Sequence, residues 1–215
     1  MNKGATAGFI SVGQKSPEAR LSIAPVRVGW RLSLAYVLLA LAFAYCNCAY
    51  AETRVYLVRG WFGVFSTGMD AMAEQLQSKG IKAEAIGHLE WRSAVSKIVD
   101  DWKANGSGRI VLVGHSQGAN NVIDMARELD KHNIPVDLLI TLAPFMQDPV
   151  PSNVVRAIDY YQSPGWGSPL TADPGFKGEL ANINMESDSG ILHINIDKDA
   201  KVQAQVVGAI AALLQ

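Results

Sequence analysis

A serine between two glycines is the most informative short pattern in the sequence. The pattern GHSQG at residues 114–118 follows the apolar run 109–113 and precedes a segment with helical spacing at 119–129. In this strand–turn–helix context G-x-S-x-G is typical of a nucleophilic serine, because the glycines leave room for the sharp turn that exposes the hydroxyl. The free N–H groups and the dipole of the following helix would stabilise an oxyanion there. The pattern predicts acyl transfer on Ser116; the simpler alternative is a glycine-flanked turn with a capping serine.

A nucleophilic serine needs a base to accept its proton, and four histidines are available: His88, His115, His132 and His193. His115 lies inside the turn, so we expect its side chain to point away from the nucleophile and to pack. Triads on this type of turn follow the chain order serine, acid, histidine, which favours the late His193, just before the final helix. We therefore predict His193 as the general base; the alternative is a histidine that bonds the backbone at the end of a strand.

The acid of such a triad is the least defined part of the site. It should follow one of the two strand-like segments at 136–142 and 154–161. We rank Asp148 first, with Asp159 and Asp173 as alternates, although Asp148 and Asp173 each precede a proline and would also suit a turn. A serine–histidine dyad without an acid stays open, since the third residue only orients and stabilises the histidine.

Two backbone N–H groups are predicted to form the oxyanion hole. One belongs to Gln117, directly after the serine, and the other to Trp61, in the glycine-containing loop after the first strand-like segment. The loop at 163–178 is expected to cover the site, and no insertion is long enough for a helical lid. Three aromatic residues of these two loops are expected to bind substrate: Phe62, Trp166 and Phe176.

Apolar, β-branched runs alternate with segments of helical spacing along the rest of the chain, and this alternation predicts the elements that position the site. The strand-like runs are 54–59, 82–86, 109–113, 136–142 and 154–161, with weaker ones at 179–185 and 191–196; the helical segments are 69–79, 91–102, 119–129 and 202–214. Strands joined by helix-length crossovers indicate a parallel sheet covered on both faces. We predict one compact α/β domain with a mostly parallel sheet, helices on both faces and no large lid domain.

The N-terminal quarter of the chain has a different character. An uncharged, apolar stretch follows two arginines and ends in the motif AYA at 49–51, which satisfies the small-x-small rule for signal peptidase. We predict an N-terminal extension and secretory signal over residues 1–51, cleaved after Ala51. The domain at 52–215 would then be exported, to the periplasm or the exterior.

An uncleaved membrane anchor at 32–50 is the alternative to a signal peptide. It is less favoured because the strongly apolar part covers only residues 32–45, and a span takes roughly 20 residues. The segment before the apolar stretch is unusually long for a signal peptide. Translation that begins near Val26 or Val28 is therefore a further hypothesis.

Composition excludes several classes of protein. The 215 residues are 49% hydrophobic, which argues against disorder, and a net charge of -1 leaves no electrostatic footprint for nucleic acid. Five of the 19 basic residues, one of the 20 acidic residues and both cysteines precede residue 52, so the predicted mature domain carries a charge of about -5 and no thiol. No metal-binding or phosphate-binding motif occurs. We expect no metal and no cofactor.

The chain resembles the α/β-hydrolase superfamily, and within it small secreted bacterial lipase- or thioesterase-like serine hydrolases. The resemblance covers residues 55–207 and rests on VRGWFGVFSTGMDAMAEQL at 58–76, GHSQGA at 114–119, and two later pieces, GELANINM and HINID. It implies a parallel-sheet hydrolase fold and a triad in the order serine, acid, histidine. Relatives of this group place an aspartate directly after the strand that ends at residue 142. This chain has Ala143 there, so the expected carboxylate is missing.

These observations predict an exported serine hydrolase that cleaves a carboxylic ester or thioester through an acyl-enzyme on Ser116, with His193 as general base. The alternatives are a non-catalytic, hydrolase-like binding protein and an acyltransferase that uses the same residues. Small-molecule and lipid esters are not ranked by the sequence, and the oligomeric state is left open. Contact with a membrane is expected only through the N-terminal segment, if it is not cleaved. The missing lid disfavours an interfacially activated lipase.

Overall fold

The computed structural model describes residues 52–214, apart from residues 62 and 189. The predicted signal segment with its cleavage after Ala51, and the predicted pocket residue Phe62, lie outside the described residues. Within the described part of the chain, no helix combines the length and the apolar character needed to cross a membrane.

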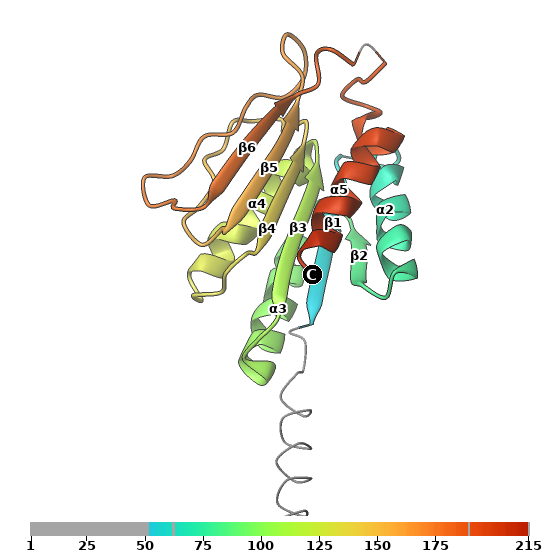
Figure 1. The fold of residues 1–215 in the computed structure, drawn as a ribbon. Helices are drawn as coiled ribbons and strands as arrows, with labels where there is room; N and C mark the ends of the chain where they lie inside the picture. The colour runs from blue at the N-terminus through green and yellow to red at the C-terminus, as the bar shows by residue number, and fades with distance from the viewer. Residues whose placement is uncertain (1–51, 62, 189, 215) are drawn as a thin grey trace, which may run out of the picture. The chain divides into compact units, whose positions relative to one another are not determined.

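Six parallel strands form a single sheet in the order β2-β1-β3-β4-β5-β6 (Figure 1). The strands are β1 (Thr53–Val58), β2 (Lys82–Ile86), β3 (Arg109–His115), β4 (Leu138–Leu142), β5 (Arg156–Tyr161) and β6 (Glu179–Asn184). The predicted fold class is confirmed: the sheet is parallel throughout, and helices cover both of its faces.

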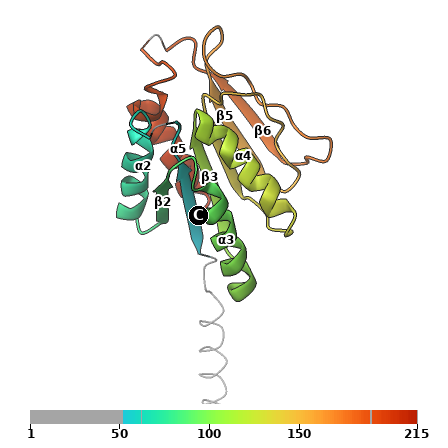
Figure 2. The same cartoon turned by 180° about the vertical axis from the view of Figure 1, so that it is seen from behind.

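Helices α2 (Thr67–Ser78) and α5 (Ala200–Ala212) cover one face of the sheet, and α3 (Trp91–Asn105) and α4 (Gln117–Asp130) cover the other (Figures 1 and 2). The central strands feed both hydrophobic cores because successive side chains point to opposite faces. In β1, Val55 and Leu57 pack in the α2/α5 core, whereas Tyr56 and Val58 pack in the α3/α4 core. Burial on both faces explains why these strands are continuous apolar runs in the sequence.

The connections make all six strands parallel, so that their carboxyl ends lie together along one edge of the sheet. Helices α2, α3 and α4 carry the chain from β1 to β2, from β2 to β3 and from β3 to β4, while loops without a helix join β4 to β5 and β5 to β6. Because the strands are parallel, their carboxyl ends share an edge, which is where open α/β sheets bind ligands. We call it the carboxyl edge and the opposite one the amino edge.

The strand predicted at 191–196 is wrong. Residues 193–195 form a turn, and the 3-10 helix η1 (Ile196–Lys198) leads into α5. The side chain of Asn195 stabilises the turn, since its Oδ1 accepts from the N–H of Leu192 and its Nδ2 donates to the carbonyl of Gly190. Ile191 and Ile196 are both buried, although positions five apart would face opposite sides of a strand, so the burial fits the turn and not the predicted strand. The other predicted elements differ from the observed ones mainly at their ends.

Candidate active site

Ser116 occupies a strained turn between β3 and α4. Its φ of 57° and ψ of -123° lie in a region that L-residues rarely adopt. Both flanking glycines are required by close packing: a Cβ on Gly114 would lie 2.3 Å from the carbonyl oxygen of Gly118, and one on Gly118 would lie 2.2 Å from that of Val58. The expected strand–turn–helix context is therefore present, and the turn can pack this closely because Gly114 and Gly118 carry no Cβ atom.

The predicted base lies against the predicted nucleophile. His193 Nε2 and Ser116 Oγ are 2.9 Å apart, a hydrogen-bond distance, although 77 residues separate them in the sequence. Burial, reinforced by the nearby His115, lowers the pKa of His193 to about 4, so its imidazole is neutral near pH 7. A neutral imidazole whose Nε2 accepts the serine proton has the tautomer that a general base requires.

The other ring nitrogen of His193 has no partner. Its Nδ1 is buried and makes no hydrogen bond to any described residue. When Nε2 accepts from the serine, Nδ1 carries the hydrogen, so this is an unsatisfied N–H at the place where a triad acid would bind. The geometry is that of a serine–histidine dyad.

None of the three predicted acids contacts His193, and the structure corrects the assignment of Asp148 as its partner. Asp148 follows β4 as expected, but its carboxylate accepts a hydrogen bond of 2.6 Å from Asn120 Nδ2, in the first turns of α4. Asp173 lies near the amino edge, where its N–H donates to the carbonyl of Val150. The carboxylate of Asp148 is thus committed to local structure, and Asp173 lies at the opposite edge of the sheet from Ser116.

Asp159 is also directed elsewhere. It lies within β5, is fully buried and accepts a hydrogen bond of 2.6 Å from the hydroxyl of Thr141 on the neighbouring strand. Burial raises the pKa of Asp159 to about 7. Its neighbours Ile158 and Tyr160 face the α2/α5 core, so its side chain points to the opposite face of the sheet.

Ala143 marks the end of β4 beside the nucleophile. The preceding carbonyl, of Leu142, accepts a hydrogen bond of 2.9 Å from the N–H of Ser116. Ala143 is 1% exposed and has a φ of 47°, which aspartate and asparagine tolerate better than alanine does. The position at which the resemblance implies an aspartate therefore adjoins the site and carries a methyl group.

The loop after β1 passes against Ser116, as the oxyanion-hole prediction requires. A Cβ on Gly60 would lie 3.0 Å from that of Ser116, so a larger residue is crowded at this point. Trp61 follows directly, and its side chain is exposed beside the ring of Phe145, with centroids 6.0 Å apart. Gln117 is the first residue of α4, and a first helical N–H has no acceptor within its own helix.

The predicted aromatic pocket residues separate in the structure. Trp166 lies over the base, with its ring centroid 5.1 Å from that of His193. Phe176 does not lie at the site: it packs against the α3/α4 core just before the start of β6, at the amino edge. The expectation that the whole loop at 163–178 covers the site is thereby corrected. A loop that joins parallel neighbours must cross from one edge to the other, so only its first part can lie beside Ser116.

A buried hydrogen-bond chain that the sequence did not reveal holds the base in place. His115 Nε2 lies 2.7 Å from the backbone carbonyl of His193, which can only accept, so this nitrogen carries a hydrogen. Burial lowers the pKa of His115, and its neutral ring then accepts at Nδ1 from the hydroxyl of Ser66, 2.8 Å away. Ser66 Oγ in turn accepts from the N–H of Gly60. His115 packs, as predicted, but it also connects the loop after β1 to the segment that carries His193.

Two aspartates near the last helix have different roles. Asp199 caps α5, because its side chain accepts from the N–H groups of Lys201 and Val202. Asp197 is fully buried and accepts from the N–H of Gly68 at the start of α2. Burial raises the pKa of Asp197 to about 6. Neither residue had a sequence signal beyond its position before a helix.

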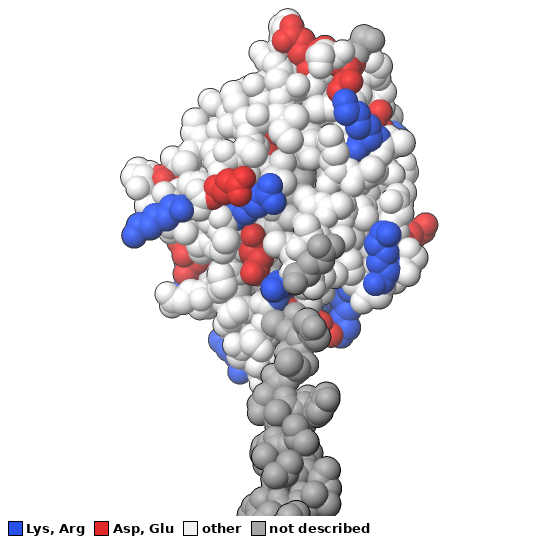
Figure 3. Space-filling view, viewed as in Figure 1, with Lys and Arg blue, Asp and Glu red and all other residues white. Residues whose placement is uncertain are grey.

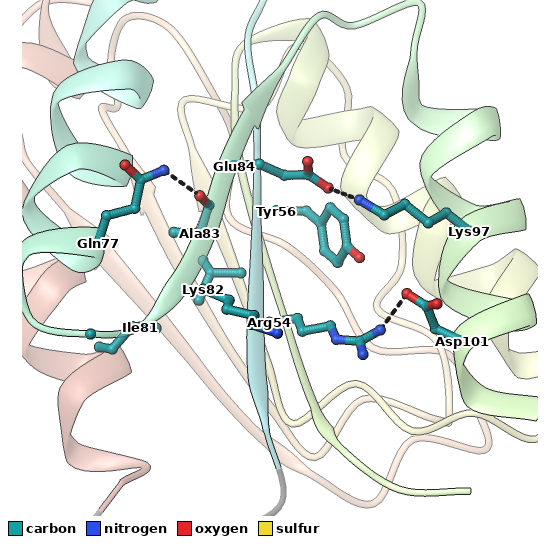
Figure 4. Close-up of a pocket in the computed structure, with 11 residues that line it drawn as sticks. Arg54, Tyr56, Gln77, Ile81, Lys82, Ala83, Glu84, Lys97 and Asp101 are labelled. Carbon is teal, nitrogen blue, oxygen red and sulfur yellow. Dashed lines mark hydrogen bonds and ion pairs between the residues drawn. The ribbon is translucent and has the colours of Figure 1, made fainter. Parts of the chain in front are cut away.

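A hollow of about 530 Å³ lies away from Ser116, at the β2 edge of the sheet (Figure 4). Five of its eleven lining residues are charged, with Arg54 paired to Asp101 and Lys97 paired to Glu84. Its lining contains neither a serine nor a histidine, so it offers no nucleophile and no base. Over the described residues, no group of three or more His, Cys, Asp or Glu side chains is arranged to hold a metal ion.

Solved structures of other proteins resemble this one. A gene product of Listeria innocua has a TM-score of 0.51 at 12% identity, over 72% of this chain and 92% of that one. The NocB thioesterase domain of the nocardicin cluster, in covalent complex with a fluorophosphonate nocardicin G analog, has a TM-score of 0.50 at 12% identity, over 77% and 96%. A cutinase-like protein from Cryptococcus sp. has a TM-score of 0.50 at 14% identity, over 76% and 94%.

These likenesses define the fold: the chain has the α/β-hydrolase fold. At such low identities they extend no further than the fold, which hosts many functions. No protein-family model and no curated protein matches the sequence.

Proposed function

We propose that the protein is an exported serine hydrolase that cleaves a carboxylic ester or thioester through an acyl-enzyme on Ser116. The observation that carries the proposal is the 2.9 Å contact between His193 Nε2 and Ser116 Oγ on a strained, glycine-flanked turn. Strain of this kind persists where the surrounding structure imposes it, and it concentrates at functional sites.

The reaction proceeds in two halves. Ser116 Oγ attacks the carbonyl carbon while its proton passes to His193 Nε2, and the resulting oxyanion is held by the N–H groups of Gln117 and Trp61. His193 then gives the proton to the departing alkoxide or thiolate, which leaves the acyl group on the serine. Water, deprotonated by the same nitrogen, attacks the acyl-enzyme, releases the carboxylic acid and restores the serine hydroxyl.

The dyad defines how His193 must work. Without a carboxylate at Nδ1, nothing offsets the positive charge that the imidazole gains during the attack, which is consistent with its low pKa. The ring is positioned instead through the backbone: His115 holds the carbonyl of His193, and Trp166 packs beside the imidazole. We therefore expect slower turnover than a full triad supports, since loss of the acid costs about 10⁴-fold in a serine protease.

A fluorophosphonate probe tests the proposal, because it reacts only with an activated serine. We expect covalent labelling of the wild type and none of Ser116→Ala, together with hydrolysis of a short p-nitrophenyl ester that Ser116→Ala loses. Ser78→Ala is the matched control, since that hydroxyl is exposed and bonds only the backbone of its own helix. A folded wild type that neither labels nor hydrolyses the ester would contradict the proposal.

A non-catalytic binding protein is the second candidate, favoured by the unpartnered Nδ1 of His193. Such a protein would keep the hydrolase fold and bind acyl compounds without turning them over. The two candidates separate in one experiment: a binding protein would retain an ester unchanged in equilibrium dialysis, whereas the hydrolase would release acid from it.

A further inference from the structure

Exposed apolar side chains gather around the proposed site. Eleven large apolar side chains are exposed among the described residues, and nine of them lie on loops at the carboxyl edge. We call these nine the apolar rim: the exposed apolar side chains of the loops at 59–66, 87–90 and 143–147, together with Trp166, Leu192 and Ile194. The other two, Val155 and Leu214, lie before β5 and after α5.

Three loops form one side of the apolar rim. The loop after β1 exposes Val64 and Phe65, and the loop after β2 exposes Leu89 to 81%. The loop after β4 exposes Met146 and Phe145, and the ring of Phe145 lies beside that of Trp61. The contact between these rings joins two loops that are 84 positions apart into one apolar surface.

The proposed base stands within the apolar rim. Leu192 and Ile194 flank His193 in the chain, and both are more than half exposed. Trp166, 57% exposed, packs against the imidazole from the loop after β5. The side chains that approach substrate are thus surrounded by apolar surface that the fold leaves uncovered.

The apolar rim surrounds the proposed active site, and this position limits which partners can bind to it without blocking access to Ser116. Contiguous exposed apolar surface on a soluble protein marks a binding surface for protein or membrane. A protein partner seated on this surface would also close access to Ser116. A lipid layer that contains the ester would cover the exposed apolar side chains of the rim and would also bring the substrate to Ser116.

The charges around the apolar rim favour a neutral layer. Arg59 is paired with Asp70, and Lys198 donates to the carbonyl of Ile194, so both cations are engaged within the protein. Figure 3 shows positive and negative side chains interspersed over the face that it presents, without a gathering of cations. Because anionic lipid is attracted by clustered lysine and arginine, the engagement of Arg59 and Lys198 within the protein favours neutral over anionic lipid.

We propose that the apolar rim docks on a neutral lipid surface and that the hydrolase acts on an ester held in that surface. The inference rests on the proposed function and narrows its substrate class. It adds a membrane contact to the one that the sequence allows through the N-terminal segment if that segment is not cleaved. None of the described residues forms a lid over the rim, so none of them has to open before docking.

Site-specific fluorescence tests the docking in the full chain. The described residues contain no cysteine, so Leu89→Cys or Val155→Cys can be labelled singly after Cys46→Ser and Cys48→Ser. With phosphatidylcholine vesicles, a solvent-sensitive label at Leu89 should shift its emission to shorter wavelength, while a label at Val155 should not. The readout reports which face meets lipid, whether or not the N-terminal segment is also bound. Equal shifts at both positions, or none at Leu89, would overturn the proposal.

A kinetic experiment separates docking from chemistry. The triple variant Phe65→Ser, Leu89→Ser, Met146→Ser removes apolar side chains from three loops, and the double variant Val155→Ser, Leu214→Ser is its matched control. We expect at least a tenfold loss in hydrolysis of a long-chain p-nitrophenyl ester embedded in the vesicles, since each apolar side chain that is removed takes away part of the hydrophobic contact with lipid. Hydrolysis of a dissolved short ester should not change, and the control should lose neither activity.

The outcomes distinguish this inference from the proposed function. Equal losses on embedded and dissolved ester would overturn the docking role while the hydrolase stands. A shift at Leu89 without any turnover would contradict the hydrolase and leave the lipid contact supported. A rim that instead joins two copies would appear as a dimer that the triple variant dissociates, with no shift on vesicles, and would overturn the proposal.

Discussion

The two nitrogens of His193 are in different situations, and this difference defines the chemistry of the site. Nε2 meets the serine hydroxyl, whereas Nδ1 is buried without an acceptor. A buried, unsatisfied N–H costs free energy, about 1–3 kcal/mol, so its persistence calls for a reason. The methyl group of Ala143, at the end of β4, occupies the place where the resemblance implies a carboxylate.

Ala143→Asp should convert the dyad into a triad. The carboxylate would stabilise the imidazolium and raise the pKa of His193 above its value of about 4. Because the base must be neutral to act, the acidic limb of the kcat/KM profile should move to higher pH, and kcat should rise by about tenfold or more. The backbone favours the change, since its φ of 47° suits aspartate better than alanine.

Ala143→Asn is the control, because it has nearly the same shape and no charge. The pH profile of kcat/KM decides between the two. If both variants behave alike, a carboxylate at this position does not reach His193.

Ser66→Ala tests the chain of hydrogen bonds that positions the base. The change leaves His115 Nδ1 and the N–H of Gly60 without their shared partner, which should destabilise the fold by about 1–3 kcal/mol. It should also lower kcat more than it changes KM, since the base would lose orientation while substrate contacts remain. Urea unfolding and steady-state kinetics measure the two effects. Loss of stability with unchanged kcat would show that Ser66 stabilises the fold but does not position His193.

At the level of elements, the sequence predicted what depends on local pattern. The two-sided burial of the central strands made them apolar runs, and GHSQG combined a motif with the strand and helix that give it meaning. Ser116 and His193 were brought together as their chain order suggested. The turn at 193–195 was missed because Asn195 replaces a sheet partner with bonds from its own side chain.

The remaining parts of the site depend on tertiary geometry that a single sequence does not carry. Asp148, Asp159 and Asp173 all had suitable positions in the chain, but the carboxylates of Asp148 and Asp159 are bonded to other side chains and Asp173 lies near the amino edge. Phe176 is on the loop that was expected to cover the site, but it lies near the amino edge, because a connection between parallel strands must cross from one edge of the sheet to the other. The Ser66–His115 link joins positions 49 apart and follows no motif.

The packing of β1 against α4 gives a test of the turn itself. In Gly118→Ala, the new Cβ would lie 2.2 Å from the backbone oxygen of Val58, a clash that only movement of the strand or helix relieves. We expect a loss of about 3 kcal/mol or more in the free energy of unfolding, because overpacking against backbone is costly. Gly208→Ala in α5 is the control: its Cβ meets nothing within 4 Å, so it should stabilise the protein by about 0.5–1 kcal/mol. Equal effects in urea unfolding would refute the close approach.

On the scale of the whole molecule, the proposed active site and the exposed apolar side chains lie together at the carboxyl edge. Four buried ionisable side chains affect the stability of the fold. Burial raises the pKa of Asp159 to about 7 and that of Asp197 to about 6, while it lowers the pKa of His115 and of His193. All four groups are therefore favoured in their neutral forms in the folded protein. Ionisation of the two aspartates lowers the free energy of unfolding as the pH rises, and protonation of the two histidines lowers it as the pH falls. The protein should therefore be most stable in mildly acidic solution.

Asp159→Asn isolates one of these groups. A carboxyl whose pKa is raised by folding contributes stability that is complete below its unfolded pKa of 3.8 and is lost as the pH rises through its folded value of about 7. Between pH 5 and pH 8 the wild type should lose about 2 kcal/mol from this source, and the uncharged amide should not. Urea unfolding of both proteins at the two pH values measures the difference. Asp100→Asn, at an exposed position on α3, should keep the pH dependence of the wild type, and parallel curves for Asp159→Asn and the wild type would show that Asp159 is already ionised in the folded protein.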